Sequence, residues 1–299
     1  MKENFSFNEI IQAYGEEGST AEAYPITTSA ISFREIIETN NEKPATTPTS
    51  DDDTVDLFDN GRIERREKFD VASYSTPASY HTEHTNQDAL LVNREIGCFA
   101  VVDGMGGEGG DPRELATALA AILQDELTFN AHNSQELLDG MRMAFREARV
   151  KLGSRNYLDG GAVATAIKLQ QIGDDFFVGI AHAGDTRLMA ADPTTGEFIA
   201  LTEDHGYGST VTNGFIRGIN GEKDDFNVWK VMPGTRIMLC SDGITGDWGP
   251  DNAYGRPNQF LSDREFKVAF TQNTPEESIK KFVEFSKKDD DKSIIVIDI

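Results

Sequence analysis

Aspartates at the ends of apolar runs constrain this sequence more than any other feature. Three short apolar runs, ending at positions 102, 183 and 240, are each followed within two residues by an aspartate. These residues are Asp103, Asp185 and Asp242; Asp88 borders a further run, and the acidic segment 289–291 abuts the last one. One aspartate beside a glycine is an ordinary turn signal. Five such positions together predict that strand ends gather hard oxygen ligands for Mg²⁺ or Mn²⁺.

The pattern from about Phe69 onward is that of strands and helices. Alternating or apolar runs predict strands at 68–75, 88–93, 96–103, 161–170, 175–183, 186–191, 197–201, 226–232, 235–241 and 293–298. Helical periodicity predicts a helix that starts at Pro112 with Asp111 as its N-cap, and others at about 134–152, 263–271 and 275–287. Because strands cluster together rather than alternating strictly with helices, the pattern favours an α+β fold of antiparallel sheets covered by helices.

Charge and hydropathy exclude several classes of function. A formal net charge of −23 without a basic cluster argues against nucleic acid as a partner. No run reaches the roughly 20 apolar residues of a membrane span, and the N-terminus lacks a signal-peptide profile, so we expect a cytoplasmic protein without a membrane partner. Cys98 and Cys240 each lie in an apolar run, where core packing is a better interpretation than a disulfide or a nucleophile.

The first 66 residues differ in kind from the rest. Residues 1–60 carry thirteen acidic and three basic side chains, and 39–59 is polar and turn-forming, as in a disordered linker. Two segments, 6–11 and 32–37, nearly repeat each other as short amphipathic helical motifs. The two segments are docking peptides for a partner, or they pack on the catalytic domain, or their similarity is chance. Partner capture by a variant with both Phe7 and Phe33 replaced would separate these alternatives. We therefore expect a largely disordered acidic tail at 1–66 and a catalytic domain, expected to be monomeric, at 67–299.

Seven motifs occur in a fixed order along the second part of the chain. They lie at 86–88, 103–107, 160–165, 184–187, 201–205, 241–243 and 290–293. This set resembles the metal-dependent protein phosphatases of the protein phosphatase 2C type, in the form that bacterial members favour. The resemblance covers about Phe69 to Ile299 and implies a four-layer α-β-β-α sandwich with the metal site at one edge. It also implies a serine/threonine protein phosphatase that acts in signalling, with phosphoserine and phosphothreonine proteins as substrates.

The resemblance also assigns roles to individual residues. By it, Asp103 bridges two tightly bound Mg²⁺ or Mn²⁺ ions, the carbonyl of Gly104 binds one of them, and Asp242 and Asp290 complete the other. Asp185 matches a contact to a third, weaker ion.

Two further residues, Asp88 and Gln87, would hold metal-bound water. The reaction implied is hydrolysis of a phosphomonoester by a metal-activated water, with Asp88, Asp103 and Asp242 as the catalytic aspartates. Asp204 and His205 are assigned to scaffolding.

The sequence departs from the family pattern at several positions. Glu83 stands where the family often has an arginine that clamps phosphate, Gln87 replaces a glutamate, and Met105 and Glu108 stand where relatives place a histidine acid. The general acid is therefore unassigned, with His81, His84 and His182 as candidates by residue type only. These departures leave open an alternative, in which the domain is a weakly active or inactive phosphatase-like module that binds phosphorylated partners.

We predict that Glu83→Arg lowers the Michaelis constant for a small aryl phosphate by about fivefold. A carboxylate a few ångströms from the substrate dianion opposes binding by on the order of 1 kcal/mol at a surface-like dielectric. Steady-state kinetics measures the effect, with Glu83→Gln as the variant that removes the charge without adding one. A Michaelis constant that is unchanged or raised in both variants would mean that the phosphate is clamped elsewhere.

Overall fold

The chain divides into two units, Met1–Arg66 and Glu67–Ile299. The computed structural model describes residues 69–79, 86–106, 111–154, 160–207, 210–216, 221–246 and 260–299, all of them in the second unit. The repeats at 6–11 and 32–37 and the positions Glu83, His81, His84 and Glu108 lie outside the described residues.

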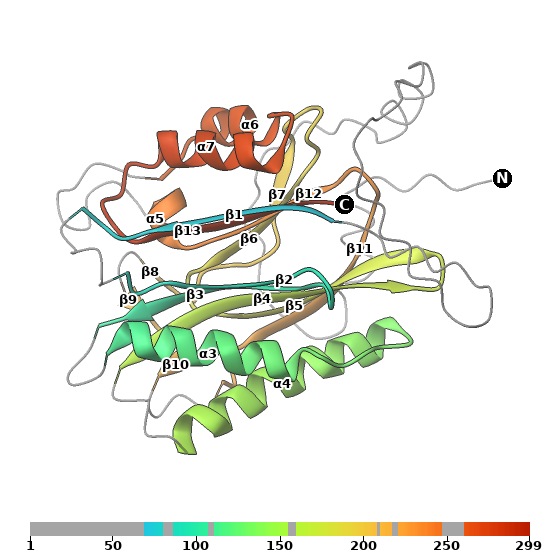
Figure 1. The fold of residues 1–299 in the computed structure, drawn as a ribbon, viewed down its shortest axis with the longest axis vertical. Helices are drawn as coiled ribbons and strands as arrows, with labels where there is room; N and C mark the ends of the chain where they lie inside the picture. The colour runs from blue at the N-terminus through green and yellow to red at the C-terminus, as the bar shows by residue number, and fades with distance from the viewer. Residues whose placement is uncertain are drawn as a thin grey trace. The chain divides into compact units, whose positions relative to one another are not determined.

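Two stacked antiparallel sheets form the middle of the second unit (Figure 1). The first sheet has the order β1-β13-β12-β6-β7. Its strands are β1 (Asp70–Thr76), β13 (Lys292–Asp298), β12 (Arg236–Cys240), β6 (Arg187–Ala191) and β7 (Phe198–Ala200). Its first strand pair joins residues far apart in sequence: Val71 of β1 lies opposite Ile297 of β13. The C-terminal strand is thereby held between a strand from the start of the domain and one from its second half.

The second sheet has the order β11-β5-β4-β3-β2, with β10 paired to β4. Its strands are β2 (Ala89–Asn93), β3 (Cys98–Met105), β4 (Gly161–Ile172), β5 (Asp175–Ala183), β10 (Phe215–Ile216) and β11 (Asp225–Val231). A separate two-stranded ribbon consists of β8 (Gly206–Tyr207) and β9 (Thr210–Val211). The register between β3 and β4 places Asp103 opposite Val163 and Gly104 opposite Ala162.

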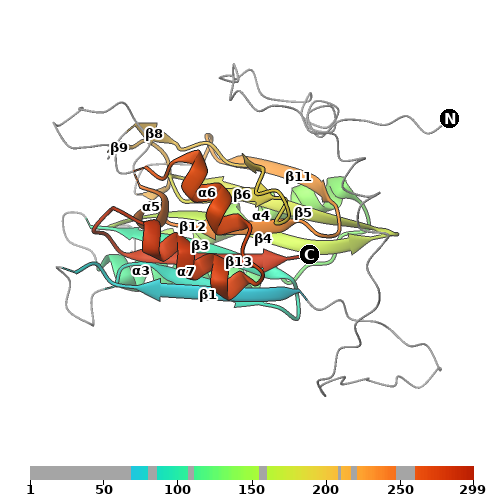
Figure 2. The same ribbon diagram turned by 90° about the horizontal axis from the view of Figure 1, so that it is seen from above.

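Helices cover the outer face of each sheet and complete four layers. Against the second sheet lie α3 (Pro112–Glu126) and α4 (Ser134–Ser154), and against the first lie α6 (Asp263–Phe270) and α7 (Pro275–Phe285). Figure 2 shows α7 running along β1 and β13, both of which it contacts. A short helix, α5 (Asp242–Thr245), follows β12 directly. None of the described helices is long and apolar enough to cross a membrane, and the cytoplasmic location stays a sequence-based prediction.

Three apolar clusters hold the layers together. The first lies between the two sheets and includes Phe99 of β3, Leu239 of β12 and Ile295 of β13. The others lie where α3 and α4 meet the second sheet and where α6 and α7 meet the first. Cys98 and Cys240 are fully buried in these outer clusters and are not in a disulfide, as predicted. Strands that are buried on both faces, such as β12 and β13, read as nearly continuous apolar runs in the sequence for this reason.

The predicted α+β sandwich is confirmed, and so are the predicted strands and helices to within about two residues. Asp111 caps α3 as expected, because its side chain accepts hydrogen bonds from the backbone N–H groups of Arg113 and Glu114. The sequence reading missed β8, β9, β10 and α5, each of two to four residues. Elements this short contain too few residues to show a period.

Arg236, the first residue of β12, makes a buried ion pair on which the stability of the first sheet depends. Arg236 is only 1% exposed, and its Nε and Nη2 atoms each lie 2.6 Å from a carboxylate oxygen of Asp298. Its Nη1 atom donates to the carbonyl oxygens of Phe270, at the end of α6, and of Gln272, two residues beyond it. Because removing one partner leaves buried polar groups without compensation, Arg236→Leu should lower the free energy of unfolding by about 3 kcal/mol.

Urea unfolding measures this change. The control is Lys267→Ala, which breaks a more exposed ion pair with Glu197 and should cost less than about 1 kcal/mol. Equal losses in the two variants would contradict a special role for the buried arginine.

Candidate metal centre

Five aspartates from separate parts of the chain converge at one edge of the sandwich. Asp103 lies near the end of β3, and the carboxylates that act on it electrostatically are those of Asp88, Asp242, Asp185 and Asp290. Asp88 immediately precedes β2, Asp185 lies between β5 and β6, Asp242 opens α5, and Asp290 precedes β13. The structure therefore brings together all five aspartates that the sequence singled out. Their roles in metal binding and catalysis stay predictions.

Burial of four of these side chains, those of Asp88, Asp103, Asp185 and Asp242, disfavours their charged forms. Burial, followed by the charges of the neighbouring aspartates, raises the pKa of Asp103 well above its ordinary value. Burial is also the main cause that raises the pKa of Asp88 and of Asp185 to about 7. The pKa of Asp242 is raised as well, by burial first, although Lys288 opposes the shift. Groups of this kind gain most from a bound cation, because the cation compensates for both burial and mutual repulsion.

The residues present fit a divalent metal. All candidate ligands are oxygens, which suit Mg²⁺ or Mn²⁺. Oδ1 of Asp88 is buried and has no hydrogen-bond partner, while Oδ2 of the same residue accepts a hydrogen bond from Ser241 Oγ at 2.9 Å. A buried carboxylate oxygen without a partner, within a cluster of other carboxylates, is a position that a bound ion or a water would satisfy.

Glycines let the backbone close around the aspartates. A Cβ atom on Gly104 would lie 2.6 Å from the carbonyl oxygen of Gln87. The same oxygen accepts a hydrogen bond from the Gly104 N–H. A Cβ atom on Gly243 would lie 1.8 Å from the carbonyl oxygen of Asp291. Both distances are too short for any side chain, so the glycine in each Asp-Gly pair is needed for close approach rather than for a turn.

Asp291 and Ser241 fix the positions of the aspartates without being predicted to hold metal. The carboxylate of Asp291 accepts hydrogen bonds from the backbone N–H groups of Ala78 and Gln87, each at 2.7 Å. Ser241 donates to Asp88 and accepts from the backbone N–H of Ser293 at 3.0 Å. The sequence reading included Asp291 in its acidic segment but gave it no separate function. Its signal was the position next to Asp290, where the family writes asparagine.

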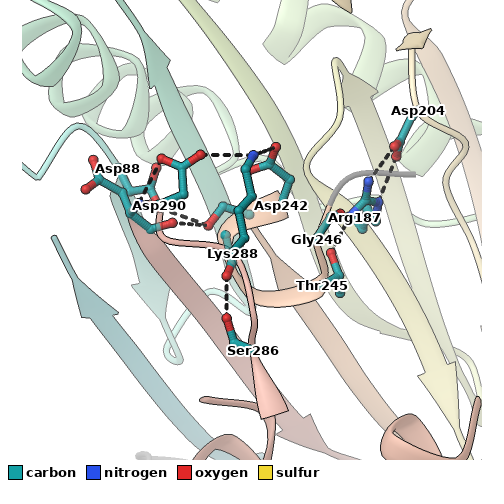
Figure 3. A network of polar contacts seen from close by, with 12 residues as sticks. Asp88, Arg187, Asp204, Asp242, Thr245, Gly246, Ser286, Lys288 and Asp290 are labelled. Atoms are coloured by element: carbon teal, nitrogen blue, oxygen red, sulfur yellow. Dashed lines mark hydrogen bonds and ion pairs between the residues drawn. The ribbon is translucent and has the colours of Figure 1, made fainter. Parts of the chain in front are cut away.

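Arg187 ties two of the sequence motifs together. Its guanidinium makes two hydrogen bonds to the carboxylate of Asp204, at 2.9 and 2.6 Å. The same group donates to Thr245 Oγ1 and to the carbonyl oxygen of Gly246, at the end of α5 (Figure 3). Because α5 begins with Asp242, these contacts at the end of the helix help to orient a candidate metal ligand. The observed contacts agree with the scaffolding role expected for Asp204.

A second group of potential ligands consists of His182, His205 and Asp225, whose ligand atoms lie within 4.8 Å of one another. Their ring nitrogens are already engaged. His182 bonds to Thr165 Oγ1 and to the carbonyl oxygen of Glu203, both at 2.9 Å, so Nε2 must donate to the carbonyl and Nδ1 accept. His205 bonds to Asp225 at 2.9 Å. These contacts favour a hydrogen-bonded scaffold over a metal site.

The same geometry argues against His182 as the general acid. The side chain has no exposed surface, and burial lowers its pKa to about 4. A general acid has to reach the leaving group and carry a proton near neutral pH. His182 meets neither requirement. His81 and His84, the other candidates, lie outside the described residues.

Lys288 is a residue of the candidate site that the sequence motifs did not predict. Its ammonium group makes ion pairs with both Asp242 and Asp290 (Figure 3). A lysine two residues before an aspartate carries no recognisable pattern in the sequence. Only the loop between α7 and β13 brings it back onto Asp242.

Comparisons with solved structures show which class of protein has this fold. The regulatory component PppA of the type VI secretion system in Pseudomonas aeruginosa is 20% identical with a TM-score of 0.58, covering 78% of this chain and 98% of that one. The catalytic domain of the serine/threonine phosphatase PstP, solved with two manganese ions, is 18% identical with a TM-score of 0.57, covering 77% and 98%. The photosystem II phosphatase PBCP is 16% identical with a TM-score of 0.60, covering 77% and 98%.

The fold is therefore that of the serine/threonine phosphatases of the protein phosphatase 2C type, as the motifs predicted. At these identities the likeness is one of fold. No protein-family model matches the chain, and no curated protein matches it in sequence.

The raised pKa of Asp88 predicts how stability depends on pH without metal. The ordinary pKa of the carboxyl is 3.8 and its folded value about 7, so the folded protein binds the additional proton between these limits. Its contribution to stability is complete below pH 3.8 and is lost as the pH rises through about 7. His182 has the opposite effect on stability: its pKa is lowered from 6.5 to about 4 in the folded protein, so its contribution increases as the pH rises between these values. The effect of Asp88 is therefore measured as a difference between the parent protein and a variant.

We predict that Asp88→Asn makes the fall of unfolding free energy with rising pH less steep by up to about 1.4 kcal/mol per pH unit. Urea unfolding in chelator, across pH 5 to 7.5, measures the two slopes. Parallel curves for the parent protein and the variant would show that Asp88 is ionised throughout this range.

Proposed function

We propose that this protein is a metal-dependent serine/threonine protein phosphatase. The observation that carries the proposal is the convergence of Asp88, Asp103, Asp185, Asp242 and Asp290 at one edge of a phosphatase fold. The activity, the phosphoprotein substrates and a place in signalling come from the resemblance and from the neighbours' printed names, and for this chain they are proposals. Manganese is present in the PstP structure, and both Mg²⁺ and Mn²⁺ suit an all-oxygen site.

The proposed site assigns a task to each aspartate. Asp103, with the carbonyl of Gly104, would hold two cations, and Asp242 and Asp290 would complete the site of one of them. Asp185 would contact a third and weaker ion. Bound divalent cations supply an activated water and offset the charge that develops on the phosphoryl oxygens.

The remaining chemistry belongs to the chain itself. Asp88 is held by Ser241 and has one oxygen without a partner, which supports the proposal that it would orient water by hydrogen bonding. Asp291 fixes the backbone of Gln87, and thereby the approach of Gln87 to Gly104. Arg187 is committed to Asp204 and α5, and is not available to bind substrate phosphate.

The alternative, a weakly active or inactive module that binds phosphorylated partners, rests on the sequence at position 83 and on Lys288. Glu83 removes the family's phosphate clamp, and Lys288 neutralises part of the predicted metal site. Docking through the acidic tail remains a hypothesis that goes with either function. Activity with and without added metal separates the two.

We predict that hydrolysis of an aryl phosphate by the full chain requires added Mn²⁺ and that Asp242→Asn lowers turnover by at least about a hundredfold. The loss follows because an amide is neutral and a poor ligand for a divalent cation. Absorbance of the released phenol measures turnover, and circular dichroism checks that the variant is folded. The matched control is Asp263→Asn, at the start of α6, which should retain full activity.

Full turnover in chelator, or an active Asp242→Asn enzyme, would refute the metal mechanism. No turnover with either metal, together with binding of a phosphopeptide, would favour the alternative.

A further inference from the structure

Lys288 lies between two carboxylates that are predicted to bind the same metal ion. Its Nζ atom is 2.9 Å from Asp290 Oδ2 and also makes a short ion pair with Asp242 Oδ2. The lysine and Asp242 side chains are 17% and 13% exposed, so their ion pair is largely enclosed, whereas the Asp290 side chain is 35% exposed and lies at the solvent side of the contact. Figure 3 shows the ammonium bridging the two carboxylates, with Asp88 on the far side of Asp290.

The charge balance of the site explains why a lysine is held there. Five aspartates meet in a small volume, and their mutual repulsion requires a cation in the absence of metal. Arg187, another buried cation in the described part of the chain, donates to Asp204, Thr245 and Gly246. Among the described residues, the ion pairs of Asp242 and Asp290 are those with Lys288.

We propose that Lys288 is a built-in counter-ion that a metal must displace, so that this residue sets the metal affinity of the Asp242 and Asp290 site. The inference rests on the proposed function only in so far as that site binds a divalent cation. Lys288 is a positioning residue in this scheme, because it acts through the metal ligands.

Exchange of the two cations follows from geometry and charge. A metal held by both Asp242 and Asp290 would compete with the ammonium for their carboxylates, and a divalent cation beside the ammonium would repel it. The four-carbon stem of lysine is flexible, so the ammonium can leave the carboxylates without a change in the fold. Metal binding is therefore weakened by the energy of the ion pairs that it breaks.

Calorimetric titration of the full chain with Mn²⁺ tests the proposal at one fixed pH near neutrality. We expect Lys288→Met to bind Mn²⁺ at least about tenfold more tightly than the parent protein, because methionine keeps the length of the side chain without its charge. Lys288→Arg retains the charge and should stay near the parent affinity. The matched control is Lys287→Met: the neighbouring lysine pairs with Glu265 at 3.1 Å and should not affect metal binding.

Thermal unfolding supplies a second measurement that does not depend on activity. In chelator, Lys288→Met should unfold at a lower temperature than the parent protein, because the aspartates lose their counter-ion. Its increase in unfolding temperature on addition of Mn²⁺ should be larger, since tighter binding gives a larger stabilisation.

The outcomes separate this inference from the proposed function. Equal or weaker Mn²⁺ binding by Lys288→Met, with binding by the parent intact, would overturn the role of Lys288 alone. Mn²⁺ binding by Lys288→Met but not by the parent protein would support the role of Lys288, and would mean that the metal does not displace the lysine from the two carboxylates of the parent. Absence of binding in both would overturn the metal site and the inference together.

Discussion

The repulsion among five clustered carboxylates, four of them largely buried, is the constraint on which the rest of the site depends. The charges of Asp88, Asp185, Asp242 and Asp290 raise the pKa of Asp103, and burial is the largest cause that disfavours its ionised form. A fold tolerates such a cluster only if cations or protons compensate for it. In this chain the compensation comes from Lys288 and from raised pKa values, and in the proposed enzyme it would come from divalent metal ions.

The surrounding structure holds the carboxylates in place against this repulsion. Backbone N–H groups of Ala78 and Gln87 fix Asp291, and Ser241 links Asp88 to the start of β13. Arg187 fixes the C-terminal end of α5. Because two sheets are packed face to face, the strand ends and turns that carry these groups meet at one edge. The apolar layers between sheets and helices therefore supply the rigidity that the polar site lacks.

Most of the fold and the identity of the clustered aspartates could be predicted from the sequence. Apolar runs marked nearly every long strand, because strands covered on both faces contain few polar residues. The aspartates were visible because each follows or precedes such a run. The missed elements, β8, β9, β10 and α5, are too short to show periodicity. His182 was an acid candidate by residue type, and only its burial and two hydrogen bonds show that it is not suited to that role.

The sequence by itself determined the α+β class, the boundaries of the long elements and the set of acidic residues, because these depend on local periodicity and composition. Tertiary structure alone decided which groups surround them. Asp291 receives N–H groups from residues more than 200 positions away, and Lys288 reaches back 46 positions to Asp242. Contacts of this kind leave no local pattern, since they arise only when the sheets pair and the strand ends come together. The sequence shows that residue 288 is a lysine and therefore charged, but only the fold places it between Asp242 and Asp290, the two candidate metal ligands.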